Sequence, residues 1–367
     1  MYDCIPDNPY YLLTPGPLST SKGVRNALLR DWCTWDEDYN KGVVQEIRKE
    51  LVCMAASNPE EYTAVLMQGS GTFGVEACLG TAIDSSGAKL LIISNGAYGM
   101  RMAAIMKVMK RDYVLLSYEE TEQPCLQDIE VQLKNDPTIT HVAMVHCETT
   151  TGILNPIEEI SKLVKQYGKT IIIDAMSSFA GIPIDMSELN VDFLISSANK
   201  CIQGVPGFSF IIAKKSALQA CEGHAHSFSL DLYDQWKTMD LSGKWRFTSP
   251  THVLRAFQQA LAELKEEGGV KARYARYSDN QHILSEGMKK LGYHPLLEDQ
   301  FQSPIITSFL YPGKNFAFNT FYETMKQKGF VLYPGKISKA DTFRIGTIGD
   351  IYPETMKQLL NAIKEAG

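Results

Sequence analysis

The feature that most constrains the fold is a series of short apolar segments, separated by helical patterns, between Glu61 and Ala213. Several of these segments are continuous apolar runs, such as Ile171-Ile172-Ile173. Such runs are typical of strands that helices cover on both faces of a sheet. The predicted strands are Thr63–Gln68, Leu90–Ser94, Tyr113–Ser117, His141–His146, Thr170–Asp174, Phe193–Ser197 and Phe208–Ala213. We therefore expect an α/β fold with a wound, mostly parallel sheet.

Helical patterns occupy the connections between these strands and much of the chain after Pro250. Helices are predicted over residues 73–82, 97–110, 155–168, 251–267 and 270–291. A chain of 367 residues has the length of two domains. We expect a large α/β domain over residues 20–250, a smaller α+β domain over residues 251–367, and an N-terminal segment, residues 1–19, that packs with the small domain.

Composition and charge exclude several classes of protein. With 44% apolar and 21% charged residues the chain is neither disordered nor fibrous, and its net charge of −6 disfavours a nucleic-acid binder. It has no apolar run of the roughly 18 residues that a membrane span needs, and its start lacks the pattern of a signal peptide. The eight cysteines and seven histidines show no metal-site spacing. We expect a cytoplasmic protein with reduced cysteines and no bound metal.

A glycine-rich loop, Gly69-Ser70-Gly71-Thr72-Phe73-Gly74, joins a predicted strand to a predicted helix. Glycines and free N–H groups at the start of a helix favour an anion, so the loop predicts a phosphate site. A nicotinamide dinucleotide would also need an acidic residue at the end of the next strand, which instead ends in Ser94-Asn95-Gly96. No Gly-Lys-Ser/Thr follows, which excludes a P-loop. A nicotinamide enzyme, and a turn in which Ser70 and Thr72 only cap the helix, remain alternatives.

Two reactive side chains follow neighbouring predicted strands. Asp174 ends one strand, and Lys200 comes shortly after the end of the next. In wound sheets ligands bind at the carboxyl ends of the strands. Pyridoxal 5′-phosphate needs a lysine for its Schiff base, an anion beside its pyridine nitrogen and a cradle for its phosphate. Taken singly, Asp174 is also explained as a capping residue and Lys200 as a solvated one, but together with the glycine loop they predict this cofactor.

The chain also carries several motifs in a fixed order. They are Thr14-Pro15-Gly16-Pro17, Gly69-Ser70-Gly71-Thr72, Asn95-Gly96-Ala97-Tyr98-Gly99, His146-Cys147-Glu148-Thr149-Thr150-Thr151-Gly152, Asp174-Ala175, Lys200 and Phe343-Arg344-Ile345-Gly346. In this order they resemble the class V branch of the aspartate-aminotransferase fold, also called fold type I. The resemblance covers nearly the whole chain and implies a pyridoxal-phosphate-dependent aminotransferase.

The resemblance implies a role for each matching residue. Lys200 would hold the cofactor as a Schiff base and act as general base, and Asp174 would pair with the pyridinium nitrogen. Tyr98 stands where the family often places a Trp stacked on the cofactor ring, and Thr149 would donate to the phenolic oxygen of the ring. The implied phosphate contacts within one chain are Ser70, Gly71, Thr72 and Asn199.

Three further residues are assigned by the same resemblance. Thr248 would reach the phosphate of a neighbouring subunit, which implies a homodimer with shared active sites. Arg344 would grip the acidic group of the substrate, because a planar guanidinium fork matches a carboxylate or a phosphonate. A surface ion pair is the alternative explanation of Arg344. Gly16 is expected beside the substrate.

Within the family, the segments Leu13–Pro17, Arg30–Tyr39 and Lys200–Gly207 carry the greatest resemblance to enzymes that move the amino group of 2-aminoethylphosphonate to pyruvate. Alanine–glyoxylate and serine–pyruvate transfer are the alternatives. A cysteine desulfurase is disfavoured because no cysteine follows Cys221. We expect Trp32 and Trp35 to serve packing or a dimer contact, and not to touch the substrate.

Overall fold

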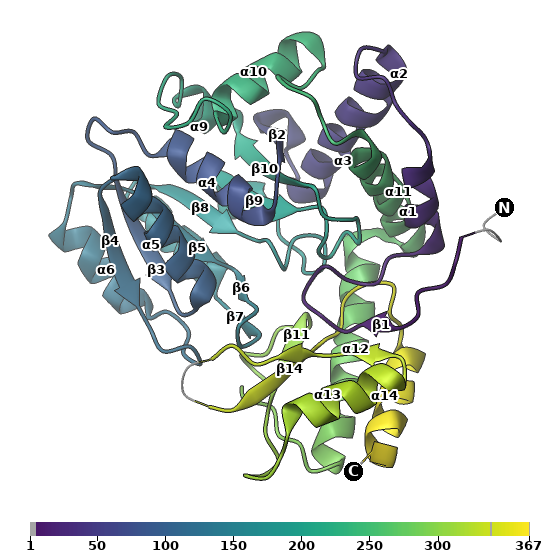
Figure 1. The fold of residues 1–367 in the computed structure, drawn as a ribbon. Helices are drawn as coiled ribbons and strands as arrows, with labels where there is room; N and C mark the ends of the chain where they lie inside the picture. Colours follow the sequence, from purple (N-terminus) through teal and green to yellow (C-terminus); the bar gives the residue numbers. More distant parts are fainter. Residues whose placement is uncertain (1–4, 338–339, 367) are drawn as a thin grey trace.

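A seven-stranded sheet forms the centre of the structure, a computed structural model that describes residues 5–337 and 340–366. Its strands, in spatial order, are β2 (Tyr62–Gln68), β10 (Phe208–Lys214), β9 (Phe193–Ser197), β8 (Thr170–Asp174), β5 (Ile139–Val145), β3 (Lys89–Ser94) and β4 (Tyr113–Ser117). Only β10 runs against its neighbours, β2 and β9. The predicted wound, mostly parallel sheet and its seven strands are therefore confirmed (Figure 1).

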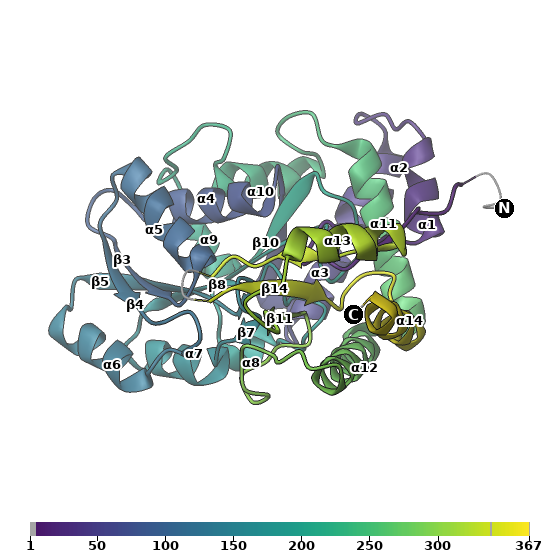
Figure 2. The same ribbon diagram turned by 60° about the horizontal axis from the view of Figure 1, so that its bottom comes forward.

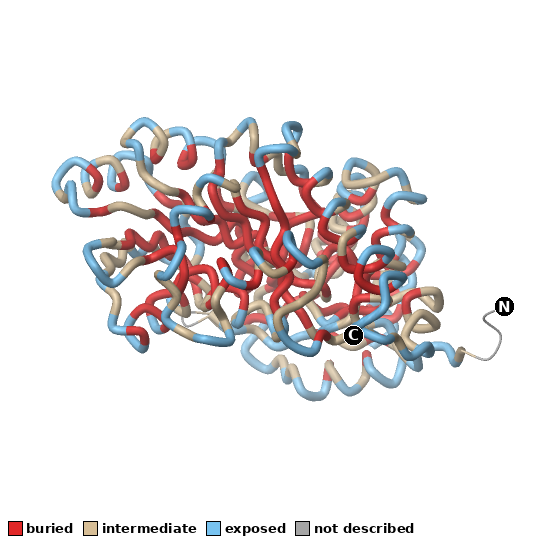
Figure 3. The backbone as a smooth tube through the Cα atoms, turned by 90° about the horizontal axis from the view of Figure 1, so that it is seen from above, coloured by how far each residue is buried: buried red, intermediate tan, exposed pale blue. Residues whose placement is uncertain are grey.

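Helices cover both faces of this sheet. Figure 2 shows α4 (Gly71–Ala82) and α5 (Ala97–Met109) on one face, and α6 (Leu126–Asn135) and α7 (Ile157–Gln166) on the other. The continuous run Ile171–Ile173 of β8 is wholly inaccessible to solvent, as expected for a strand covered on both sides. The buried part of the chain accordingly runs through the middle of the molecule (Figure 3).

Short elements and three longer helices complete the large unit. The short elements are α1 (Lys22–Asn26), η1 (Ala27–Leu29), α2 (Glu37–Tyr39), η2 (Asn40–Gln45), η3 (Pro59–Glu61), α8 (Met186–Leu189), α9 (Lys215–Gln219) and the hairpin β6 (Cys147–Glu148) and β7 (Ile153–Leu154). The longer helices are α3 (Glu46–Ala55), α10 (Leu232–Ser242) and α11 (Thr251–Glu267). Leu254 and Phe257 of α11 belong to the same buried cluster as the central sheet.

A second buried cluster lies under a small antiparallel sheet of β11 (Ile306–Leu310), β14 (Thr342–Gly346) and β13 (Tyr333–Pro334). The helices α12 (Gly269–Lys290), α13 (Phe318–Gln327) and α14 (Pro353–Ala366) contribute to it. From the N-terminal segment, β1 (Tyr11–Leu12) pairs with β12 (Phe330–Val331), and Leu13 is buried in this cluster.

The predicted domain boundaries remain predictions. The packing of α11 on the central sheet favours a boundary within α12, because its residues from Leu284 onward belong to the second cluster. Residues 1–4 of the predicted N-terminal segment, and Gly367 of the predicted small domain, lie outside the described residues.

Three classes of feature are absent from the described part of the chain. None of its helices combines the length and the apolar character needed to cross a membrane. Its seven cysteines, from Cys33 to Cys221, are unpaired. No three potential metal ligands cluster within residues 5–337 and 340–366.

Candidate active site

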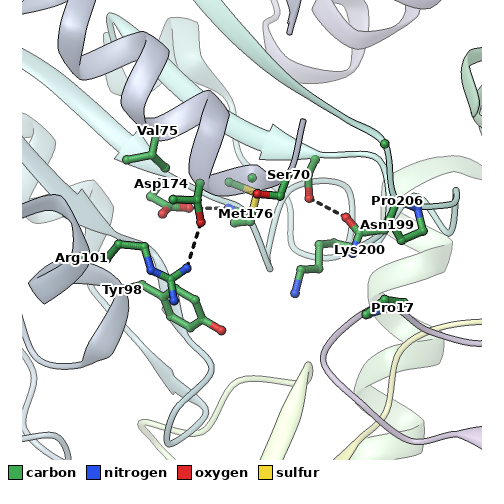
Figure 4. A pocket seen from close by; sticks show the side chains of 14 residues that line it. Pro17, Ser70, Val75, Tyr98, Arg101, Asp174, Met176, Asn199, Lys200 and Pro206 are labelled. Carbon is green, nitrogen blue, oxygen red and sulfur yellow. Dashed lines mark hydrogen bonds between the residues drawn. The ribbon is translucent and has the colours of Figure 1, made fainter. Parts of the chain in front are cut away.

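A cavity of about 320 Å³ opens where β8 and β9 end, at the carboxyl edge of the central sheet. Figure 4 shows side chains from the start of α4, from α5, from the ends of these strands and from the N-terminal loop facing it. The structure brings together seven of the predicted site residues in its wall: Ser70, Gly71, Thr72, Tyr98, Asp174, Asn199 and Lys200. Segments far apart in the sequence thus meet at the edge where wound sheets bind ligands.

Lys200 projects into this cavity under the N-terminal loop. Its Nζ donates a hydrogen bond to the carbonyl oxygen of Pro15 at 2.7 Å. Burial lowers the pKa of the Lys200 amine to about 8, because a charged ammonium loses its hydration there. Gly16 has a φ of +116°, and a Cβ at this position would lie 2.7 Å from Cδ of Lys200. The loop can therefore close on the lysine only with glycine at position 16.

Asp174 lies at the end of β8 and is 4% exposed. Burial raises the pKa of its carboxyl group to about 6, and a hydrogen bond from the backbone N–H of Met176, at 2.9 Å, acts against this rise. The positive charges of Lys200 and Arg101 also favour the ionised form. A cation beside its second oxygen would stabilise a buried carboxylate of this kind. The protonated nitrogen of a pyridinium ring would be such a cation.

The glycine loop forms the start of α4. Ser70 occupies the N-cap position, but its side chain makes no capping hydrogen bond, so the interpretation of this hydroxyl as a mere helix cap is wrong. Gly71 is packed so closely that a Cβ there would meet the side chain of Met176. Ser70 is exposed and Thr72 half-buried, and both border the cavity. Their hydroxyls and the free N–H groups of the helix start make a cradle for an anion.

Thr149 lies in the turn between β6 and β7 and is completely buried. Its Oγ1 has no hydrogen-bond partner among the described residues, and a buried hydroxyl without a partner costs free energy. Its carbonyl oxygen accepts a hydrogen bond from Nη1 of Arg344 at 2.7 Å. The unpartnered hydroxyl fits the predicted contact with the phenolic oxygen of the cofactor.

Arg344 reaches this turn from β14 of the small sheet. It is 3% exposed, and its Nε donates a second hydrogen bond, to the carbonyl oxygen of Pro334 at 2.9 Å. Burial lowers the pKa of the Arg344 guanidinium. No carboxylate of the described residues forms an ion pair with it, so the alternative of a surface ion pair is wrong for this arginine. Its remaining donors are available to an anion.

Thr248 is exposed and is not part of the wall of this cavity. Trp32 and Trp35, which we expect to serve packing or a dimer contact, lie outside the cavity wall as well. Trp35 is 78% exposed beneath the Lys244 amine, and Trp32 stacks on Arg30. Within the described residues of one chain, Thr248 therefore lies outside the cavity wall, and its predicted role depends on a second subunit.

Sequence reasoning missed two residues of this region, Glu148 and Arg101. Glu148 is fully buried, and its carboxylate accepts hydrogen bonds from the backbone N–H of Tyr98 at 3.0 Å and from Oγ1 of Thr150 at 2.8 Å. Burial raises the pKa of Glu148 to about 7. Arg101 lies in the cavity wall one turn after Tyr98 on α5. The spacing of three residues, which places both on one helix face, is the signal that could have found it.

Comparisons with known proteins agree with this geometry. A sequence model described as "Aminotransferase class-V" matches residues 45–328. A Bacteroides fragilis protein named 2-aminoethylphosphonate–pyruvate transaminase is 62% identical over 97% of this chain and 99% of its own length. A protein of the same name from Vibrio vulnificus is 58% identical over 98% of both chains.

Solved structures share the fold at lower identity. The alanine–glyoxylate aminotransferase of Nostoc sp. superposes with a TM-score of 0.90 at 22% identity, over 99% of this chain and 96% of the other. The pyridoxamine–pyruvate aminotransferase of Mesorhizobium loti gives a TM-score of 0.89 at 22% identity, over 98% of this chain and 92% of the other. At such identities the likeness concerns the fold alone.

Proposed function

Because the chain belongs to the class-V aminotransferase family and has the fold type I architecture, we propose that it transfers the amino group of 2-aminoethylphosphonate to pyruvate. The products are phosphonoacetaldehyde and L-alanine, and the role is the breakdown of a phosphonate. One observation carries the proposal: relatives with this name are 57–62% identical to the chain over 97–98% of its length.

The cofactor of this enzyme family is pyridoxal 5′-phosphate, and the residues of the cavity fit it. Asp174 and Lys200 of the cavity wall would supply the carboxylate and the amine that its ring requires, and the unpartnered Oγ1 of Thr149, in the turn between β6 and β7, would supply the donor to its phenolic oxygen. Ser70, Thr72 and the N–H groups at the start of α4 would hold its phosphate. When bound, the cofactor supplies an electron sink for the electron pair left behind when a carbon beside the nitrogen loses its proton.

Lys200 carries the proton transfers. Since burial brings its pKa to about 8, about a tenth of its amine is neutral at pH 7, far more than in a solvated lysine, which suits a general base. With the cofactor bound, Nζ would take a proton from the substrate carbon that bears the nitrogen and would deliver it to the cofactor carbon joined to the same nitrogen. The carbonyl of Pro15 is an acceptor that orients this amine, and the Gly16 loop restricts water around it. Asp174 would hold the pyridinium nitrogen of the cofactor, and that positive charge would keep its carboxylate ionised.

Arg344 binds the acidic group of each substrate in turn. Two of its donors are held by the carbonyl oxygens of Pro334 and Thr149, which fix the plane of the guanidinium. The remaining N–H groups of the guanidinium donate to the oxygens of either a phosphonate or a carboxylate. The net charge of −6 gives no general attraction for anions, so the local positive charge of Arg344 has to provide it.

The proposal is tested by an absorbance titration of the purified protein. Adding 2-aminoethylphosphonate should convert the visible band of the bound cofactor to a near-ultraviolet band, and pyruvate should restore it with release of alanine. The matched control uses serine or alanine as donor and glyoxylate as acceptor. If these compounds convert the band and 2-aminoethylphosphonate does not, the alanine–glyoxylate or serine–pyruvate alternative is correct.

We further propose that two chains form a homodimer in which Thr248 contacts the phosphate bound by the other chain. Exposed apolar side chains near Thr248 support it, since Phe228 is 79% and Phe247 50% exposed and their rings are 5.8 Å apart. Mixing the inactive variants Lys200→Ala and Thr248→Ala tests it. Shared sites predict recovered activity, because one site of the mixed dimer is intact, and no recovery would contradict sharing.

The unpaired cysteines of the described residues support our proposal that the enzyme works in the reducing cytoplasm.

A further inference from the structure

Arg101 is a cation in the cavity wall for which the reaction described above has no use. It lies on α5, one turn after Tyr98, and its guanidinium carbon is 4.9 Å from the centroid of the Tyr98 ring. Figure 4 shows the guanidinium against this ring, facing the start of α4. Among the residues that the structure describes, no carboxylate forms an ion pair with Arg101. Its position is therefore not explained by a structural salt bridge.

The hydrogen bond of Arg101 determines what Thr72 can do. Nη1 of Arg101 donates to Oγ1 of Thr72 at 3.0 Å. A guanidinium can only donate, whereas a hydroxyl has a single proton and two acceptor positions. Thr72 must therefore accept from Arg101, and its own proton is left for another partner. Because Thr72 borders the cavity, that partner is an acceptor within it, such as a phosphate oxygen.

The positive charge of Arg101 also favours an anion beside Thr72. Arg101 and Lys200 are the cationic residues of the cavity wall, and Asp174 is its acidic residue. An arginine stays charged at every pH at which proteins are folded, whereas the Lys200 amine loses its charge above its pKa of about 8. Arg101 is thus the permanent positive charge beside the anion cradle of α4.

We propose that Arg101 is a positioning residue for the phosphate group of the cofactor. It turns the Thr72 hydroxyl into a donor toward the phosphate, adds positive charge at that end of the cavity, and holds the Tyr98 ring by a cation–π contact. The inference depends on the cofactor of the family and not on the proposed substrates. A test of cofactor binding can therefore fail while the proposed function stands, and the reverse also holds.

The test compares two ligands that differ only in the phosphate. The full-length protein is freed of cofactor, and its dissociation constants for pyridoxal 5′-phosphate and for pyridoxal are measured by absorbance. Arg101→Gln should weaken pyridoxal 5′-phosphate roughly 10- to 100-fold, the effect of losing a charged hydrogen-bond donor, and pyridoxal less than about threefold. Arg101→Lys keeps the charge without the fork and should give an intermediate loss, again confined to the phosphorylated ligand.

Thr72→Val supplies the second measurement. If Arg101 acts through the Thr72 hydroxyl, the double variant Arg101→Gln/Thr72→Val should bind the cofactor much better than independent effects of the two changes would predict. Lys107→Gln, at an exposed position of the same helix, is the matched control and should leave both dissociation constants unchanged.

Three results would overturn the proposal. They are an unchanged affinity of Arg101→Gln for pyridoxal 5′-phosphate, an equal weakening of both ligands, and independent effects of the two substitutions. If Arg101→Gln does not fold, Arg101→Lys and Thr72→Val decide the question, since both must weaken the phosphorylated ligand selectively.

Discussion

Phe343 and Arg344 are adjacent on β14 and are buried to the same degree, 0% and 3% exposed, in surroundings of opposite character. The ring of Phe343 is packed among aromatic side chains, with centroids 5.7 Å from Phe316 and 5.8 Å from Phe309. Arg344 faces the other way, because successive side chains of a strand alternate, and donates a hydrogen bond to the carbonyl oxygen of Thr149 in the turn between β6 and β7. One strand thus packs one side chain into the small core and places the next against the turn that holds Thr149.

The two regions use burial differently. In the Phe343 cluster, burial stabilises the fold because apolar surface leaves water. At the cavity and the adjoining turn between β6 and β7, the same burial acts against polar groups. It raises the pKa of Asp174 and lowers that of Lys200 in the cavity wall, and it leaves Oγ1 of Thr149 in the turn without a partner. Buried polar groups with shifted pKa values or without a hydrogen-bond partner are typical of ligand-binding sites. The difference predicts that substitutions on the two sides have separable effects.

The largest effect is expected at Lys200. Lys200→Ala should lower kcat/KM roughly 10⁴-fold or more, because both the covalent attachment and the general base are lost. Thermal stability should stay equal or rise, since the substitution removes a buried amine. Steady-state kinetics and a melting curve check both parts. Residual activity above about 1% of the wild type would contradict the role of this lysine.

A change of stability without a change of chemistry is expected at Phe343. Phe343→Ala should lower the free energy of unfolding by about 3–5 kcal/mol, because it leaves a cavity in the aromatic cluster. Phe343→Leu is the milder control and should cost less than half as much. Both are measured by denaturant unfolding, with the affinity for the cofactor determined on the folded protein. A loss below about 1 kcal/mol for the alanine variant would show that this core is not closely packed.

At Arg344, next to Phe343, we expect a change in kinetics and not in stability. Arg344→Lys should lower kcat/KM roughly 10- to 100-fold for both half-reactions, because the planar fork is lost while the charge remains. Arg276→Lys is the matched control: Arg276 bonds to Glu267 at 2.8 Å, away from the cavity, so its loss should affect stability and not kinetics. An unchanged pyruvate half-reaction in Arg344→Lys would remove this arginine from carboxylate binding.

The smallest effect concerns the pH dependence of cofactor capture. Only the neutral amine of Lys200 attacks the cofactor's aldehyde, and burial lowers its pKa to about 8. Below this value the ammonium form dominates, so the capture rate of the cofactor-free protein should rise about tenfold per pH unit and level off above about pH 8. Stopped-flow absorbance checks this. A rate that still rises above about pH 9 would mean that the amine is solvated.

Part of this structure could be predicted from the sequence for clear physical reasons. Continuous apolar runs such as Ile171–Ile173 indicate strands covered on both faces, and all seven were found. The reversed direction of β10 could not be predicted, because a buried strand has the same apolar pattern whichever way it runs. The order of the strands depends on how their crossovers pack, which no local pattern records.

The residues of the site also divide into those that the sequence could place and those that it could not. Asp174 and Lys200 could be placed because they follow buried strands, and the roles of these and the other site residues remain predictions from the family resemblance. Arg101 and Glu148 were missed because an arginine within a helix, or an acid within a motif, looks like a solvated residue until its surroundings are known. The contact predicted for Thr248 needs a second chain.

Borohydride reduction of the purified protein, followed by peptide mapping, tests the central assignment most directly. Reduction fixes the cofactor to whichever lysine holds it. The mass of the phosphopyridoxyl group is expected on the peptide that contains Lys200, and 2-aminoethylphosphonate added before the reductant should prevent the labelling. A label on another lysine, or none at all in the coloured protein, would contradict the assignment of this cavity as the site of amino transfer.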